Sequence, residues 1–142
     1  MVSWNNLDTL SSYKELADVK PACLTEVMSG DNGAERVKNY SVPMAAGLSY
    51  NYASKQVNEN VLDALEKLAD EAQLADKFKA LYNGEVVNTG EKRLVLHHMT
   101  RGQLGDAVEA DGVDKRTFYK TQQERIAEFA NKVHNGEITN AA

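Results

Sequence analysis

Two arginines and two histidines lie close together in the segment GEVVNTGEKRLVLHHMTRGQ, residues 84–103. Such side chains can ligate a metal ion, bind an anion or transfer protons. On a helix the side chains of His97 and His98 diverge by about 100°, so the two rings cannot ligate one metal ion from the same face. His134 is the third histidine, and cysteines or paired carboxylates at ligand spacing are absent from the sequence. We therefore predict no metal site.

Arg93, His97 and Arg101 form a second pattern, because they are spaced i, i+4 and i+8. In a helix over residues 90–101 the three side chains share one face. Two cations and a titratable ring in one exposed stripe favour an anion opposite: a row of carboxylates, a phosphate or a helix C-terminus. Neutralisation by neighbouring acidic residues is the alternative, and the spacing leaves both open.

Other catalytic patterns are missing from the sequence. The nine glycines are scattered, without the Gly-x-Gly spacing of a phosphate-binding loop. A reductase-type Tyr-x-x-x-Lys motif needs a tyrosine at position 51, where this chain has Asn51 before Lys55. The residues alone favour a helical binding or structural unit over a complete enzyme, with no catalytic or cofactor-binding residue.

The elements that would carry these residues are predicted to be helical. Apolar residues recur at helical spacing in several segments, most clearly at 58–73, where Asn58 is a candidate N-cap, and at 114–134, which Asp114 would cap. The predicted helices span 3–18, 21–30, 34–40, 58–73, 75–82, 90–101 and 114–134. We expect an all-α fold of about six helices in a single segment, residues 1–142.

Two stretches between these helices are not helical in pattern. Residues 41–57 are apolar without periodicity, and Pro43 and Gly47 interrupt them, which is typical of a strap lying across a neighbouring domain. The glycine-rich loop at 102–113 has a short hairpin signal at Asp111-Gly112. If the neighbour of the strap is removed, an apolar patch should be exposed, and the chain should either self-associate or form a loosely packed monomer.

Composition narrows the class of protein further. The chain has 142 residues, 42% hydrophobic and 26% charged, as in ordinary globular proteins. A net charge of −5 disfavours nucleic acid or an anionic membrane as the main partner, and no apolar run is long enough to cross a bilayer. One cysteine, Cys23, indicates a reduced, cytoplasmic setting, and its neighbours Ala22 and Leu24 favour burial of the thiol.

The opening segment resembles the N-terminal part of the glucose-6-phosphate isomerase family. That family has a pattern close to F-x-G-E-x-I-N-x-T-E-x-R-A-V-L-H-x-A-L-R before its sugar-phosphate domains. The residues in register with it are Gly84, Glu85, Asn88, Glu91, Arg93, Val95, Leu96, His97 and Arg101. Residues 50–58 resemble the family's D-Y-S-K-N-x-V-T segment, and residues 126–136 resemble its last helix before the first domain. The resemblance extends from about Cys23 to Gly136.

The resemblance implies a role for the chain within a larger protein. It implies the N-terminal helical part of an α/β enzyme that interconverts glucose 6-phosphate and fructose 6-phosphate, in glycolysis and gluconeogenesis, without metal or organic cofactor. The family's sugar-isomerase domains and catalytic Glu, Arg, His and Lys have no counterpart here. We therefore expect an inactive chain whose partners are the remaining domains, in a homo-oligomer. Arg93, His97 and Arg101 are expected to support the site from behind, and a free-standing interaction module is the alternative.

Overall fold

A computed structural model describes residues 2–102 and 105–140 and separates into two compact units. One unit comprises Asn5–Leu74, and the other comprises Met1–Trp4 with Ala75–Ala142. The described residues contain helices of both α and 3-10 type and three short antiparallel strand pairs.

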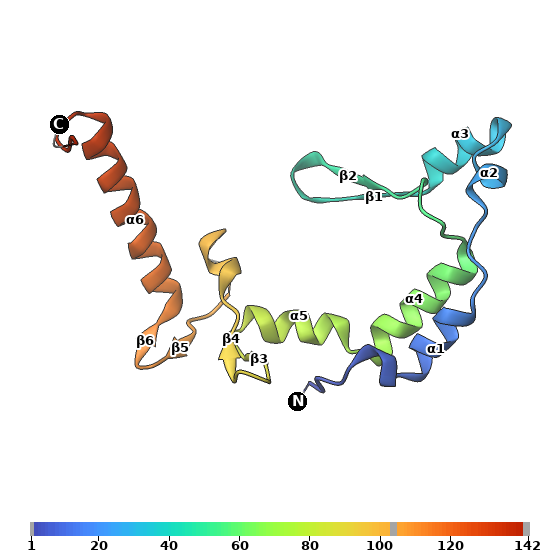
Figure 1. The fold of residues 1–142 in the computed structure, drawn as a ribbon, viewed down its shortest axis with the longest axis horizontal. Helices are drawn as coiled ribbons and strands as arrows, with labels where there is room; N and C mark the ends of the chain where they lie inside the picture. Colours follow the sequence, from blue (N-terminus) through green and yellow to red (C-terminus); the bar gives the residue numbers. More distant parts are fainter. Residues whose placement is uncertain (1, 103–104, 141–142) are drawn as a thin grey trace. The chain divides into compact units, whose positions relative to one another are not determined.

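The Asn5–Leu74 unit contains four α-helices and one hairpin (Figure 1). Its elements are η1 (Leu7–Thr9), α1 (Ser11–Asp18), α2 (Leu24–Val27), α3 (Gly30–Asn39), β1 (Ser41–Pro43), η2 (Ala45–Gly47), β2 (Ser49–Asn51) and α4 (Glu59–Glu71). The predicted helix at 58–73 is confirmed, with its cap: the Asn58 side chain accepts a hydrogen bond from the Val61 amide at 3.0 Å. Such caps satisfy one of the free amides at a helix start.

Helices α1 and α4 pack side by side (Figure 1). One carboxylate links the last residue of α4 to the first turn of α1. Glu71, the last residue of α4, accepts hydrogen bonds from the amide of Ser12 at 2.8 Å and from both hydroxyls of Ser11 and Ser12. These bonds hold the pKa of Glu71 down at about 2, and the Ser12 hydroxyl is the largest cause. The Glu71 carboxylate therefore fixes the end of α4 against the start of α1.

A buried arginine ties α3 to the chain that leads into α4. Arg36, 8% exposed, donates to the carbonyls of Ala53 at 2.8 Å, Lys55 at 3.1 Å and Val57 at 2.7 Å. Its guanidinium also lies 3.9 Å from the centre of the Tyr40 ring. A guanidinium fork suits several carbonyls at once, which is why an arginine can hold this irregular segment in place.

The first helix of the other unit is α5 (Leu74–Tyr82), whose first residue falls in the Asn5–Leu74 unit, and the last is α6 (Lys115–His134). Between them lie β3 (Val86–Asn88), β4 (Arg93–Leu94), η3 (His97–Thr100), β5 (Glu109–Ala110) and β6 (Val113–Asp114). The predicted cap of the last helix is confirmed, because Asp114 accepts hydrogen bonds from the amides of Arg116 and Thr117. The Thr117 hydroxyl, more than any other group, lowers the pKa of Asp114. The predicted hairpin at Asp111-Gly112 is confirmed as the turn between β5 and β6.

The all-α prediction is wrong, because three two-stranded antiparallel sheets accompany the helices. The predicted helix over residues 90–101 is also wrong: residues 89–92 form a turn, with Lys92 at φ 53°, and β4 then pairs back on β3. The left-handed residue and the preceding Asn-Thr-Gly sequence favour chain reversal over helix. Within the 41–57 strap, residues 41–51 form the β1–β2 hairpin. Asp31, Asn32 and Gly33, which lie between two of the predicted helices, are part of the single helix α3.

Two smaller findings bear on the sequence-based expectations. Cys23 is exposed, which corrects the expectation of a buried thiol. None of the helices in the described residues combines the length and the apolar character that a bilayer span requires.

Candidate functional site

Arg93, His97 and Arg101 do not share a helix face. Arg93 lies in the two-residue strand β4, His97 opens the 3-10 helix η3, and Arg101 follows that helix as its C-cap. All three residues are exposed. The i, i+4, i+8 stripe therefore does not form, because the chain reverses at residues 89–92 and η3 has only four residues.

Each of the three side chains has a different environment. Arg93 forms a 3.7 Å ion pair with Glu91, in which both side chains are more than half exposed. Exposed pairs of this kind contribute little to stability, typically about 0–1 kcal/mol. Among residues 2–102 and 105–140, neither the His97 ring nor the Arg101 guanidinium forms an ion pair. The titratable His97 ring and the cationic Arg101 side chain therefore face solvent in this unit.

The neighbouring His98 is the histidine that belongs to the core of this unit. Its ring stacks on Tyr82 with 4.7 Å between ring centres, and the next residue, Met99, is fully buried. The Nε2 atom of His98 is buried without a hydrogen-bond partner among the described residues. His98 therefore packs η3 against the end of α5.

Arg116 holds the same region together and was not identified from the sequence. It is 6% exposed, and its guanidinium donates to the carbonyl of Tyr82 at 2.6 Å and to the carbonyl of Asp106. The Nη1 atom is buried without a partner in the described part of the chain. Arg116 lies in the first turn of α6, the positive end of the helix dipole, where a cation is disfavoured. A cation in this unfavourable position is the signal in the sequence that its hydrogen-bond partners lie outside the first turn of α6.

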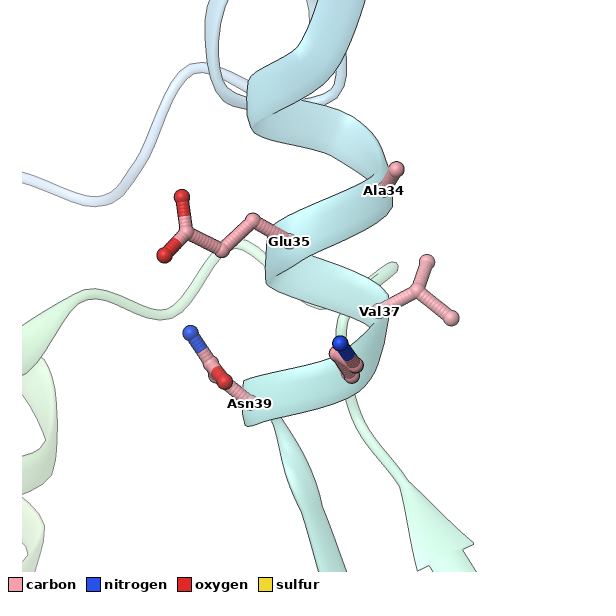
Figure 2. A pocket seen from close by; sticks show the side chains of 5 residues that line it. Ala34, Glu35, Val37 and Asn39 are labelled. Carbon is pink, nitrogen blue, oxygen red and sulfur yellow. The ribbon is translucent and has the colours of Figure 1, made fainter.

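The hollows on the described surface do not gather reactive groups. One of about 600 Å³ lies along α3 and is lined by Ala34, Glu35, Val37, Lys38 and Asn39. Figure 2 shows that Glu35 and Asn39 lie on one side of the helix, while Ala34 and Val37 point away on the other. Groups that diverge from a single helix cannot surround a substrate, so this hollow is not a candidate active site.

Two further hollows have different linings. One of about 340 Å³ lies between α2 and α3, where Glu26 and Glu35 face Arg36, whose guanidinium is already bonded to three carbonyls. Another, of about 360 Å³, is almost wholly apolar and lies between the β1–β2 hairpin and α4. No group of three or more His, Cys, Asp or Glu side chains able to hold a metal ion occurs in the described residues. These features indicate packing surfaces.

Comparison with known proteins finds one matching family and several similar sequences. A sequence model of the phosphoglucose isomerase family matches residues 51–142. A glucose-6-phosphate isomerase of Treponema denticola is 44% identical over 96% of this chain, which corresponds to 27% of that protein. The enzyme of the same name from Borreliella afzelii is 41% identical over 99% of this chain and 26% of its own length. The chain thus spans about a quarter of the length of these curated relatives.

Proposed function

Because the chain belongs to the phosphoglucose isomerase family, we propose that it is the N-terminal segment of an enzyme that interconverts glucose 6-phosphate and fructose 6-phosphate. The observation that carries this proposal is the 44% identity to a protein named glucose-6-phosphate isomerase over 96% of the chain. The activity, the sugar-phosphate substrate and the place in glycolysis belong to the complete enzyme, of which residues 1–142 form one segment.

The chain alone is proposed to be inactive. Isomerisation between an aldose and a ketose moves a proton between adjacent carbons, which needs a positioned base and groups that hold the phosphate. The three hollows described above are lined by divergent, already bonded or apolar side chains. We infer that the residues that perform the chemistry lie in the remaining domains, which are the principal partner of this segment.

Arg93, His97 and Arg101 are proposed to support those domains from outside the active site. Arg101 and His97 lack an ion pair within the described residues, and Arg93 is paired only at the surface. A cation that is solvated in the segment gains a charge-assisted hydrogen bond when an acidic group of another domain meets it. The three positions lie inside the region that the family model matches.

We propose that the parent enzyme is cytoplasmic and homo-oligomeric. The single cysteine supports a reducing compartment. Exposed apolar side chains along one side of α6 support an assembly, since soluble monomers rarely leave such stripes uncovered. These side chains are Ile126, Phe129 and Val133.

The test compares residues 1–142 with the complete enzyme in a coupled assay that follows conversion of fructose 6-phosphate. We expect turnover from the complete enzyme and a rate equal to that of buffer from residues 1–142, both purified from a host that lacks its own isomerase. An inactive complete enzyme would exclude the proposed activity. A gene whose reading frame stops directly after the codon for Ala142 would instead favour the alternative, a free-standing interaction module.

A further inference from the structure

The β1–β2 hairpin has one apolar face and one polar face. Val42 pairs directly with Tyr50, and the Met44 amide donates to the Leu48 carbonyl at 2.8 Å. Alternate residues of a strand point to the same side, so the side chains of these four residues share one face. The opposite face carries Ser41, Pro43, Ser49 and Asn51.

The apolar face is uncovered in this unit. Val42 is 45% exposed, Met44 55%, Leu48 65% and Tyr50 49%. Figure 1 shows the hairpin as two paired strands that extend beyond the end of α3. A two-stranded hairpin is at best marginally stable in water unless it packs on another element. This alternation of apolar and polar residues is that of a strand pair with one buried face.

Aromatic contacts hold the hairpin at its base, the end nearest to α3. Because this end is fixed, the rest of the apolar face is a preformed surface. Tyr50 stacks on Tyr52 with 6.1 Å between ring centres, and the Tyr52 ring centre lies 5.1 Å from that of Tyr40, with the two rings tilted against each other. The Arg36 guanidinium lies over the Tyr40 ring and also donates hydrogen bonds to carbonyls of the 53–57 segment. Next to this base lies the apolar hollow of about 360 Å³, which Val42, Tyr50 and Leu65 help to line.

We propose that the apolar face of the hairpin, Val42, Met44, Leu48 and Tyr50, docks onto an apolar surface of the remaining domains of the same polypeptide. This proposal rests on the proposed function, because it needs the chain to be part of a longer enzyme. About three quarters of the length of the curated relatives lies outside the matched region, which is the part of the polypeptide available to cover this face.

The size of the face argues against a second copy of the chain as the occupant. Side chains of at most roughly 200–250 Å² each, about half exposed, offer on the order of 400 Å² together. A stable interface between two proteins needs about 800 Å² from each partner. Docking within one polypeptide needs less area, because the covalent link removes most of the entropic cost of association.

The experiment uses the complete enzyme with a matched pair of substitutions. Leu48→Lys places a charge on the apolar face, and Ser49→Lys places the same charge on the polar face one residue away. We expect Leu48→Lys to lower the melting temperature by several degrees, independently of protein concentration, and Ser49→Lys to leave it within about one degree. Equal melting temperatures for both variants would overturn the proposal. So would an effect of Leu48→Lys confined to dissociation of the oligomer, since a second copy would then cover the face.

A second measurement covers the case in which Leu48→Lys does not fold. Leu48→Cys and Ser49→Cys are made in a Cys23→Ser background, because Cys23 is exposed, and maleimide labelling is quantified at each position by peptide mass spectrometry. We expect labelling at position 48 to be at least about tenfold slower than at position 49, and equal rates would overturn the proposal. Isomerase activity is measured on the same cysteine-variant preparations that are labelled. Slow labelling in an inactive protein would reject the proposed function alone, and fast labelling in an active one would reject the docking alone.

Discussion

Glu71, at the end of α4, accepts hydrogen bonds from the amide and the hydroxyl of Ser12, near the start of α1. The first amides of a helix have no partner within the helix, and a carboxylate there also faces the positive end of its dipole. In most helices a residue just before the first turn supplies this cap. Here it comes from a residue 59 positions along the chain, so capping and helix packing are one interaction.

The Glu71 carboxylate makes stability sensitive to acid. Its pKa is held down at about 2 in the folded chain, against roughly 4.3 for an unfolded glutamate. A group whose folded pKa is depressed stabilises above the unfolded value and loses that contribution as pH falls through the folded value. We expect the free energy of unfolding to decrease as pH falls from about 4.5 to 2, and Glu71→Gln to make this decrease shallower while lowering stability at pH 7.

The measurement is urea unfolding at several pH values, with Glu66→Gln as the control. Glu66 is an exposed glutamate of the same helix, and it forms no ion pair with any of the described residues. An identical pH profile for Glu71→Gln and the wild type would show that the Glu71 carboxylate does not titrate as the geometry requires.

Arg36→Lys should destabilise the chain although it keeps the charge. A lysine ammonium cannot reproduce the fork that reaches the carbonyls of Ala53, Lys55 and Val57, so buried acceptors lose their donors. We expect a loss of roughly 2–4 kcal/mol in the free energy of unfolding, since each hydrogen bond to a charged group contributes about 1.5–3 kcal/mol. Lys38→Arg, on the exposed surface of the same helix, should change stability by less than about 0.5 kcal/mol. Chemical denaturation of both variants checks this. Equal losses in the free energy of unfolding would contradict the role of the three Arg36 hydrogen bonds.

Comparing the stability losses of Gly84→Ala and Gly47→Ala distinguishes the cost of backbone strain from the cost of a steric collision. Both glycines have left-handed φ values, 71° and 72°. A Cβ at position 84 would collide with the Val108 side chain, whereas a Cβ at position 47 would have no neighbour within 4 Å. Gly47→Ala should therefore cost roughly 1–2 kcal/mol, the strain of a left-handed residue, and Gly84→Ala should cost clearly more. Thermal melting of the two variants measures the difference, and equal losses would mean that Val108 moves aside freely.

The elements that could be predicted from the sequence are those whose ends are marked by a capping or turn residue nearby in the sequence. Asn58 and Asp114 mark the starts of α4 and α6 because a capping side chain acts within three residues of itself. The Asp111-Gly112 turn is equally local. The family pattern over residues 84–101 was recognised from residue identities, which do not depend on the secondary structure assigned to them.

The errors arose where the decisive contact is distant in sequence or the segment is short. Residues 93–101 have helical spacing, yet a reversal at Lys92 and the burial of Met99 under α6 decide their structure. The β1–β2 hairpin was read as an irregular strap because Pro43 and Gly47 hide the alternation in strands of three residues each. Arg36 and Arg116 bond to carbonyls 10 to 34 positions away, which periodicity does not reveal.

Arg101→Ala should have different effects in residues 1–142 and in the complete enzyme. In the described part of the chain the Arg101 side chain is exposed and forms no ion pair, so its loss should cost less than about 0.5 kcal/mol there. If an acidic group of another domain meets it, as we propose, the same substitution in the complete enzyme leaves that group unpaired and costs roughly 1–3 kcal/mol. On the same proposal, turnover per intact oligomer should remain nearly unchanged, because an arginine outside the active site would not touch the substrate.

Arg125→Ala is the matched control, since Arg125 is an exposed arginine of α6 with a single 3.3 Å hydrogen bond to Gln122. Unfolding curves and steady-state kinetics of both variants separate the two roles, because a supporting arginine alters stability and a substrate-binding one alters turnover. A large drop in turnover at unaltered stability for Arg101→Ala would place this side chain at the substrate. Equal, small effects of Arg101→Ala and Arg125→Ala on the complete enzyme would instead leave Arg101 solvated, because a cation that meets no anion contributes little wherever the rest of the protein lies.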